Sequence, residues 1–123
     1  MQNAKRKIDI YERAFAFACR IVRMHQKAVQ NATSRPLLLQ VLRAGTGIGA
    51  NLEEAEAGQS KADFIAKSRI ALKEARETLY WLRLIATTEV IKATRLDPLI
   101  QESRELVAIL TSIIRSASAP RSR

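Results

Sequence analysis

The sequence predicts an all-α protein, and three observations lead to that prediction. Hydrophobic residues make up 47% of the 123 residues, and in four long stretches they recur at spacings of three and four, the period of an amphipathic helix. Only four Gly and three Pro interrupt the chain, too few for the many turns of an all-β fold. The chain is long enough for one core and too short for two. We therefore expect one antiparallel up-down four-helix bundle over residues 1–117, with a flexible basic tail over residues 118–123.

The first helix is expected over residues 7–31. Its core stripe follows the helical period and consists of Ile8, Tyr11, Phe15, Ala18, Val22, His25 and Val29. A second apolar strip lies beside this stripe and consists of Ile10, Phe17, Ile21 and Met24. Such a strip is too large to leave exposed on a monomer, so it predicts contact with another subunit.

The same helix carries a basic stripe on its far side. The first 33 residues hold seven basic and two acidic side chains, and the whole chain has a formal net charge of +9. A charged stripe of this kind is either a solvated face or a surface that follows the phosphates of a nucleic acid. On the second interpretation the nucleic-acid-binding residues are Arg13, Arg20, Arg23 and Lys27, helped by Lys5, Arg6 and Lys7.

The second helix is expected to start at the capping residues 33–34, with Pro36 in its first turn, and to end at Ala57 before a left-handed Gly58. Three glycines interrupt its pattern, and each costs roughly 1 kcal/mol against alanine, so close approach of another backbone should compensate. One face consists of Leu38, Leu42, Gly45, Ile48, Gly49, Leu52 and Ala55, and is expected to meet the core. The opposite face consists of Arg43, Gly47, Ala50, Asn51 and Glu54.

The third helix is expected over residues 61–87, because Ser60 and Asp63 have the spacing of a capping box. So short a loop makes the second and third helices antiparallel neighbours. The core stripe consists of Phe64, Ile65, Ser68, Ala71, Leu72, Ala75, Leu79, Leu82 and Ala86. The opposite side is also apolar toward its end and consists of Ile70, Glu74, Glu77, Tyr80, Trp81 and Leu84. A helix that is apolar on both sides is buried on both sides, which predicts a subunit interface.

The fourth helix has two possible starts. It begins at Thr94, with Asp97 completing a capping box, or at Asp97, with Pro98 in the first helical position, which is easier on the backbone. Its apolar period then continues to about Ala117 through Leu99, Ile100, Leu106, Val107, Leu110, Ile113 and Ile114.

Three stretches, residues 43–55, 60–65 and 74–84, resemble the four-helix bundle family of the 23S ribosomal RNA intervening-sequence proteins. The resemblance covers nearly the whole chain, although family members usually carry Ser where Gly47 stands. It implies an antiparallel bundle that assembles into a homo-oligomeric ring, usually a pentamer, without enzymatic activity. The chain is also similar to the accessory variability determinant proteins, which assist the reverse transcriptases of diversity-generating retroelements.

Signatures of catalysis and of cofactor binding are missing from the sequence. The chain has one histidine, His25, and one cysteine, Cys19, and these fit a hydrogen-bonded bundle histidine and a small core residue better than a metal site. The glycines of residues 45–49 lack the Gly-Lys-Ser/Thr ending of a phosphate-binding loop. We expect no enzyme, no metal and no cofactor. A cytoplasmic protein is expected, because no apolar run is long enough for a membrane span.

Two functions from different classes remain open. The first is a homo-oligomeric protein that binds the backbone of RNA or DNA without reading its sequence, such as an accessory factor of a reverse transcriptase or of an RNA process. The second is a scaffold that docks an acidic protein partner. Both need the oligomer, whose interface we expect to consist of Arg43, Gly47, Asn51, Glu54, Ile70, Glu74, Glu77, Tyr80, Trp81 and Leu84.

Overall fold

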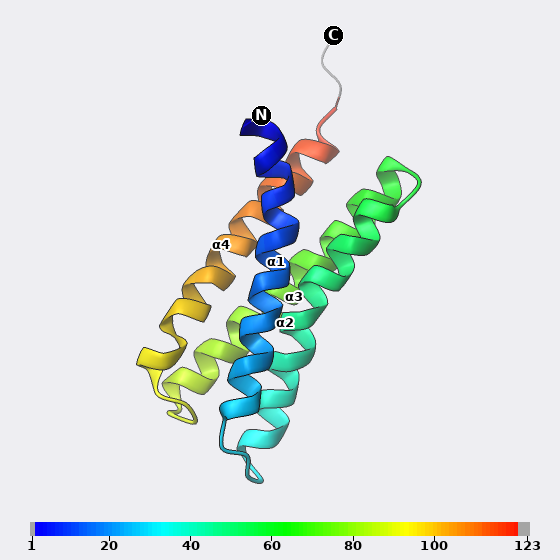
Figure 1. Ribbon diagram of the computed structural model, residues 1–123. Helices are drawn as coiled ribbons and strands as arrows, with labels where there is room; N and C mark the ends of the chain where they lie inside the picture. Colours follow the sequence, from blue (N-terminus) through cyan, green and yellow to red (C-terminus); the bar gives the residue numbers. More distant parts are fainter. Residues whose placement is uncertain (1, 121–123) are drawn as a thin grey trace.

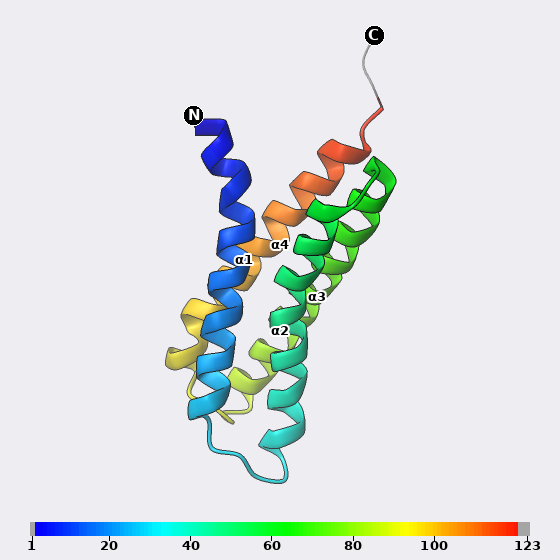
Figure 2. The same cartoon turned by 45° about the vertical axis from the view of Figure 1, so that its right-hand side comes forward.

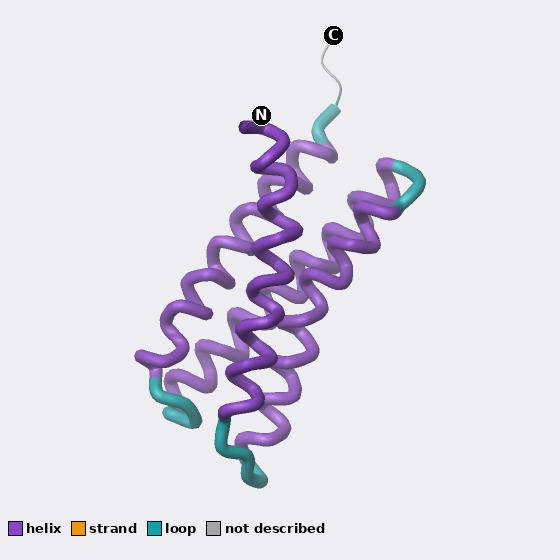
Figure 3. The backbone as a smooth tube through the Cα atoms, in the orientation of Figure 1, coloured by secondary structure: helices purple, strands orange, loops and turns teal. Residues whose placement is uncertain are grey.

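The computed structural model describes residues 2–120, with their side chains from residue 10 onward. Over that range the chain forms four helices and no strand: α1 (Gln2–Lys27), α2 (Ser34–Ala57), α3 (Lys61–Thr87) and α4 (Ala93–Ser118). They run alternately up and down and are joined by short loops (Figures 1 and 3). The predicted all-α class and the number of helices are confirmed.

Each helix packs against its neighbours in the chain, and α1 and α4 close the ring of contacts. The α2–α3 contact is the most extensive, whereas α1 and α4 touch least. Figure 2 shows α1 diverging from α2 toward the N-terminus. The helices enclose one apolar core, whose largest fully buried side chains include Phe17, Ile21, Leu38, Ile48, Leu52, Leu82, Ile85, Leu96, Leu106 and Leu110.

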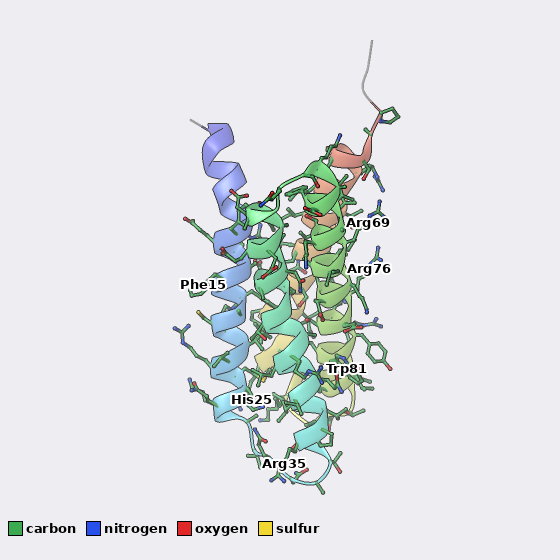
Figure 4. The ribbon with its side chains drawn as sticks, turned by 90° about the vertical axis from the view of Figure 1, so that its right-hand side faces the viewer. Phe15, His25, Arg35, Arg69, Arg76 and Trp81 are labelled. Carbon is green, nitrogen blue, oxygen red and sulfur yellow. The ribbon has the colours of Figure 1, made fainter. Side chains whose placement is uncertain are left out.

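The inward face of α1 is the strip that sequence reasoning assigned to a second subunit. Ile10, Phe17 and Ile21 are buried in the core, while Phe15 is 68% exposed and points away from the bundle (Figure 4). Val22 and Val29, also expected in the core, are exposed, and the side chain of Ile8 lies outside the described residues. The prediction of which strip enters the core was wrong because both strips have the same period. What separates the two strips is the fit to α2, where Gly49 faces Ala14 and Gly45 faces Ile21.

α1 also ends earlier than expected, at Lys27. Polar side chains hold the chain in a turn instead: the Asn31 Oδ1 accepts hydrogen bonds from the N–H groups of Thr33 and Ser34, at 3.0 and 2.9 Å. The Ser34 hydroxyl donates to the carbonyl of Val29 at 2.9 Å and accepts from the N–H of Asn31. Such local bonds compete with a helix, and they place Val29 outside the core.

At the connection between α2 and α3, one predicted helix cap is confirmed and another is wrong. The Ser60 hydroxyl accepts a hydrogen bond from the N–H of Asp63 at 3.0 Å, as the capping spacing predicts. Gly58, expected in the left-handed region, is extended, with φ −65° and ψ 156°, because the next residues must already enter α3. The left-handed residue of the described chain is Glu89, with φ 61°, just past the end of α3.

α4 begins at Ala93, one residue before the earlier of the two predicted starts, and the favoured start at Asp97 is wrong. Pro98 therefore lies inside the helix, where its missing N–H leaves the Thr94 carbonyl without a helical partner. Both residues are exposed, so water can solvate that carbonyl. The early start places Leu96 and Leu99 in the core, at 0% and 5% exposure, which offsets the proline.

Candidate nucleic-acid interface

Arg13, the first member of the predicted basic stripe, is occupied by carboxylates. Its Nε and Nη2 donate to the two carboxylate oxygens of Glu102 at 3.0 and 2.7 Å, and Nη2 also reaches Glu105 at 2.7 Å. These bonds raise the pKa of Arg13. A hydrogen bond from Gln101 is the main cause that lowers the pKa of Glu105, and the bond from Arg13 lowers it further. Arg13 thus links α1 to α4, the pair of helices with the least extensive contact, and it is a poor candidate for binding phosphate.

The other described members of the basic stripe have no carboxylate partner of this kind. Arg20 is half-buried, Arg23 and Lys27 are exposed, and none of the three forms an ion pair with a described residue. Lys5, Arg6 and Lys7 are part of α1, but their side chains lie outside the described residues. The described part of the predicted surface is therefore the C-terminal half of α1.

The fold adds cations that sequence reasoning did not include. The α1–α2 and α3–α4 loops lie at the same end of the molecule (Figure 1), and Arg35 lies beside the first of them (Figure 4). Arg23 and Lys27 share the lining of one cavity with Lys92 and Arg95 from the start of α4. An up-down bundle must bring the end of its first helix beside the start of its fourth, so the topology could have indicated this grouping. We call Arg20, Arg23, Lys27, Arg35, Lys92 and Arg95 the basic end.

A second basic surface follows the outward side of α3. Arg69, Lys73, Arg76 and Arg83 are all exposed and have no carboxylate within ion-pair distance among the described residues. Figure 4 shows Arg69 and Arg76 projecting from α3 on the side away from α1. At 1.5 Å of rise per residue, the row extends about 21 Å along the helix. Three of these residues, Arg69, Arg76 and Arg83, repeat every seven positions, a spacing that is visible in the sequence.

The predicted interface residues of α2 and α3 partly meet within one subunit. A Cβ placed on Gly47 would lie 3.2 Å from the carboxyl carbon of Glu74, so this glycine leaves room for that side chain. Burial is the main cause that raises the pKa of Glu74, followed by the negative charge of Glu77, and nearby Arg43 opposes the shift. The close approach expected between subunits at Gly47 is thus an approach between α2 and α3.

Two other polar members of that interface are bound locally. The Asn51 amide donates to the Gly47 carbonyl of its own helix at 2.8 Å. Glu54 lies 3.8 Å from the ammonium group of Lys67 on α3. These side chains remain at the surface of the hairpin, and their contacts within the subunit need no second chain.

The apolar members of the predicted interface differ in exposure. Ile70 is 40% exposed and Tyr80 is 56% exposed, whereas Trp81 and Leu84 are half-buried. The Trp81 ring packs against the core and meets the ring of Tyr80 edge to face, with centroids 5.1 Å apart. Ile70 and Tyr80 are therefore the apolar groups of α3 that a second subunit could still cover.

The two single-copy reactive residues are half-buried on α1. Cys19, expected to be a small core residue, is a free thiol that is only partly buried. His25 lies near the end of the helix. Among the described residues, none of the helices is long and apolar enough to span a bilayer.

Comparison with known proteins shows what the chain resembles. A family model described as 23S rRNA-intervening sequence protein matches residues 6–112. A crystal structure of a protein of unknown function, from the S23 ribosomal protein family of Bacteroides thetaiotaomicron, superposes with a TM-score of 0.81 and 43% identity. The match covers 86% of this chain and 98% of that one. No curated protein matches. The chain belongs to the 23S rRNA-intervening sequence protein family.

Proposed function

We propose that this protein is a non-enzymatic, homo-oligomeric bundle of the cytoplasm that binds the backbone of RNA or DNA. The observation that supports the proposal is the basic end, where cations from α1, α2 and α4 gather without an ion pair to any described carboxylate. Cations that are not already neutralised can release counterions from phosphates. The family's name refers to an RNA, which agrees with this choice of ligand.

Backbone binding is favoured over sequence readout because the basic end offers charges and no recognition motif. Contacts to phosphates position a protein without identifying bases. Each phosphate neutralised contributes roughly 0.9 to the slope of log affinity against log salt on duplex DNA, and about 0.7 on single strands. The affinity should therefore depend steeply on salt and hardly on sequence.

The test is a fluorescence-anisotropy titration of mixed-sequence RNA and DNA at several salt concentrations. Replacing Arg20, Arg23 and Lys27 together by Gln should flatten the salt slope by roughly two to three and weaken binding to all sequences alike. The matched control replaces Lys61, Arg104 and Arg115, which are exposed and lie outside both basic surfaces, so it removes the same charge elsewhere.

A third variant, with Gln at Arg69, Arg76 and Arg83, separates the basic end from the row on α3. Loss of binding in that variant alone would move the nucleic-acid site to α3. Equal, small losses in all three variants would show that only net charge matters, and the proposal of a defined surface would fail.

Assembly into a ring, a pentamer by family resemblance, would multiply these weak sites. Linked copies raise the effective concentration of each remaining site, so overall affinity can exceed that of one subunit by orders of magnitude. The exposed apolar groups Phe15, Ile70 and Tyr80 support self-association, because a monomer leaves them in water. The half-buried Glu74, held beside Glu77, would also gain from a basic group of a neighbouring subunit.

A second candidate function is a scaffold that docks an acidic protein, such as a reverse transcriptase or an RNA-processing factor. The row on α3 favours it, because Arg69, Lys73, Arg76 and Arg83 lie on one helix face beside the exposed ring of Tyr80. Aromatic and Arg side chains are enriched in protein interfaces. If the wild-type protein fails to bind RNA and DNA at low salt, this second function replaces the first.

A further inference from the structure

A cavity of about 380 Å³ opens at the basic end, between the end of α1 and the α3–α4 connection. Its volume lies within the range of about 300–1,000 Å³ that small-molecule sites occupy. Apolar side chains from both segments form part of the lining, among them Met24, Val29, Val90 and Ile91. The cavity therefore combines an apolar surface with the cations already described.

The charged part of the lining is strongly biased toward one sign. Arg23, Lys27, Lys92 and Arg95 line the cavity, and Glu89 is the only acidic residue of the described chain that does so. None of these five side chains forms an ion pair with a described residue. Four cations around one hollow repel each other, and a bound anion with several oxygens would relieve that repulsion. Arg side chains can hold a phosphate with two parallel hydrogen bonds.

The start of α4 also favours the binding of an anion in this cavity. α4 begins at Ala93, and Lys92, which precedes it, makes no capping hydrogen bond with its side chain. The first N–H groups of a helix have no partner within the helix, and they carry a partial positive charge. Lys92, Arg95 and Leu96 of this segment all line the cavity, so an anion there would lie beside the uncapped turn.

We propose that this cavity binds one phosphorylated nucleotide, either the end of a single strand or a free mononucleotide. This inference rests on the proposed function. The phosphate would contact the cations, and the sugar and base would pack on the aliphatic side chains. A paired base inside a duplex is held in the stack, and extracting it costs a few kcal/mol, whereas an unpaired end enters without that cost. The cavity thus predicts a preference for phosphorylated single-stranded ends.

The test measures the binding of matched oligonucleotides that differ only at the end: with a terminal phosphate, with a terminal hydroxyl, circular, and as a blunt duplex. A terminal phosphate should strengthen binding about tenfold or more, as expected for charge-assisted hydrogen bonds of 1.5–3 kcal/mol. Arg95→Gln should remove most of this preference. A mononucleotide should compete with the phosphorylated strand, and inorganic phosphate should compete less well.

Ala28→Leu is the decisive variant, because Ala28 lines the cavity and carries no charge. The larger side chain should narrow the hollow, leave the four cations in place and reduce the end preference. Ala32→Leu is the matched control, since Ala32 is exposed in the same loop and does not line the cavity. Thermal unfolding of both variants checks that the fold is intact.

The outcomes separate this inference from the proposed function. If wild type binds long nucleic acids with no end preference and a mononucleotide does not compete, or if Ala28→Leu keeps the preference, the inference fails and backbone binding stands. If the mononucleotide binds in the cavity and long strands do not bind, the inference holds and the proposed function fails. Competition by a mononucleotide, without any effect of a terminal phosphate on strand binding, assigns the cavity to the free nucleotide.

Discussion

Ser68 is buried at 0% exposure in α3, and its hydroxyl is the one buried side-chain polar atom without a hydrogen-bond partner among the described residues. Burying such a group without a bond costs roughly 1–3 kcal/mol. Ser68→Ala should therefore raise the free energy of unfolding by about 1 kcal/mol, measured by urea denaturation. Ser103→Ala is the matched control, because the Ser103 hydroxyl donates to the Leu99 carbonyl at 2.9 Å. If both variants gain the same stability, helix propensity is the cause.

Glu74 should make stability depend on pH. Burial and the neighbouring Glu77 raise the pKa of Glu74 in the folded chain above the ordinary 4.5 of the unfolded chain. At a pH between the unfolded and the folded pKa, the folded chain therefore binds more protons than the unfolded chain. Stability then falls as the pH rises through this window, and the penalty is complete above it. Glu74→Gln should lose less stability than wild type between pH 4.5 and 7, as measured by urea unfolding at both pH values. Parallel curves for the two proteins would contradict the burial of this carboxylate.

At the scale of elements, the glycines of α2 determine how closely α1 approaches. A Cβ on Gly45 would lie 2.9 Å from Cγ1 of Ile21, which is fully buried and cannot move away, whereas a Cβ on Gly49 would lie 3.6 Å from the Ala14 backbone. Gly45→Ala should therefore destabilise the protein by roughly 1–3 kcal/mol through overpacking. Gly49→Ala should stabilise it by about 0.5–1 kcal/mol through helix propensity. Thermal unfolding of the two variants checks the opposite signs.

Gly49→Leu extends the same comparison. A branched side chain exceeds the space beside Ala14, so α1 and α2 must separate or the new side chain must adopt a strained rotamer, at a cost of roughly 1–3 kcal/mol. An unchanged melting temperature in this variant would show that the two helices do not pack closely at this point.

At the scale of the whole molecule, the exposed apolar groups of α3 predict assembly. Ile70→Asp should weaken the oligomer, because it places a charge where Ile70 is now 40% exposed and available to a second subunit. It should leave the subunit folded, unlike Trp81→Glu, since Trp81 packs against the core. The measurement is light scattering at micromolar concentration, with circular dichroism to confirm helicity.

Arg76→Glu is the control for assembly, because Arg76 lies in the basic row of α3 and should tolerate the change. Wild type eluting as a 13.8 kDa monomer would contradict the oligomer altogether. Equal elution of the Ile70 and Arg76 variants would show that the interface lies elsewhere, with the exposed Phe15 side of α1 as the next surface to test.

The sequence by itself determined the all-α class, the number of helices and the bounds of α2 and α3, because the apolar period and the cap of α3 act locally. The Ser60 cap illustrates this, since its partner is three residues away. The caps expected for α2 are wrong, since Thr33 makes no side-chain capping bond and Gly58 is extended. The tertiary structure decided which strip of α1 is buried, because two strips with one period differ only in how they fit the glycines of α2. It also decided that Arg13 pairs with Glu102, and that Arg23 and Lys27 share a cavity with Lys92 and Arg95. Those groupings join residues that are dozens of positions apart, and only the packing of the helices brings them together.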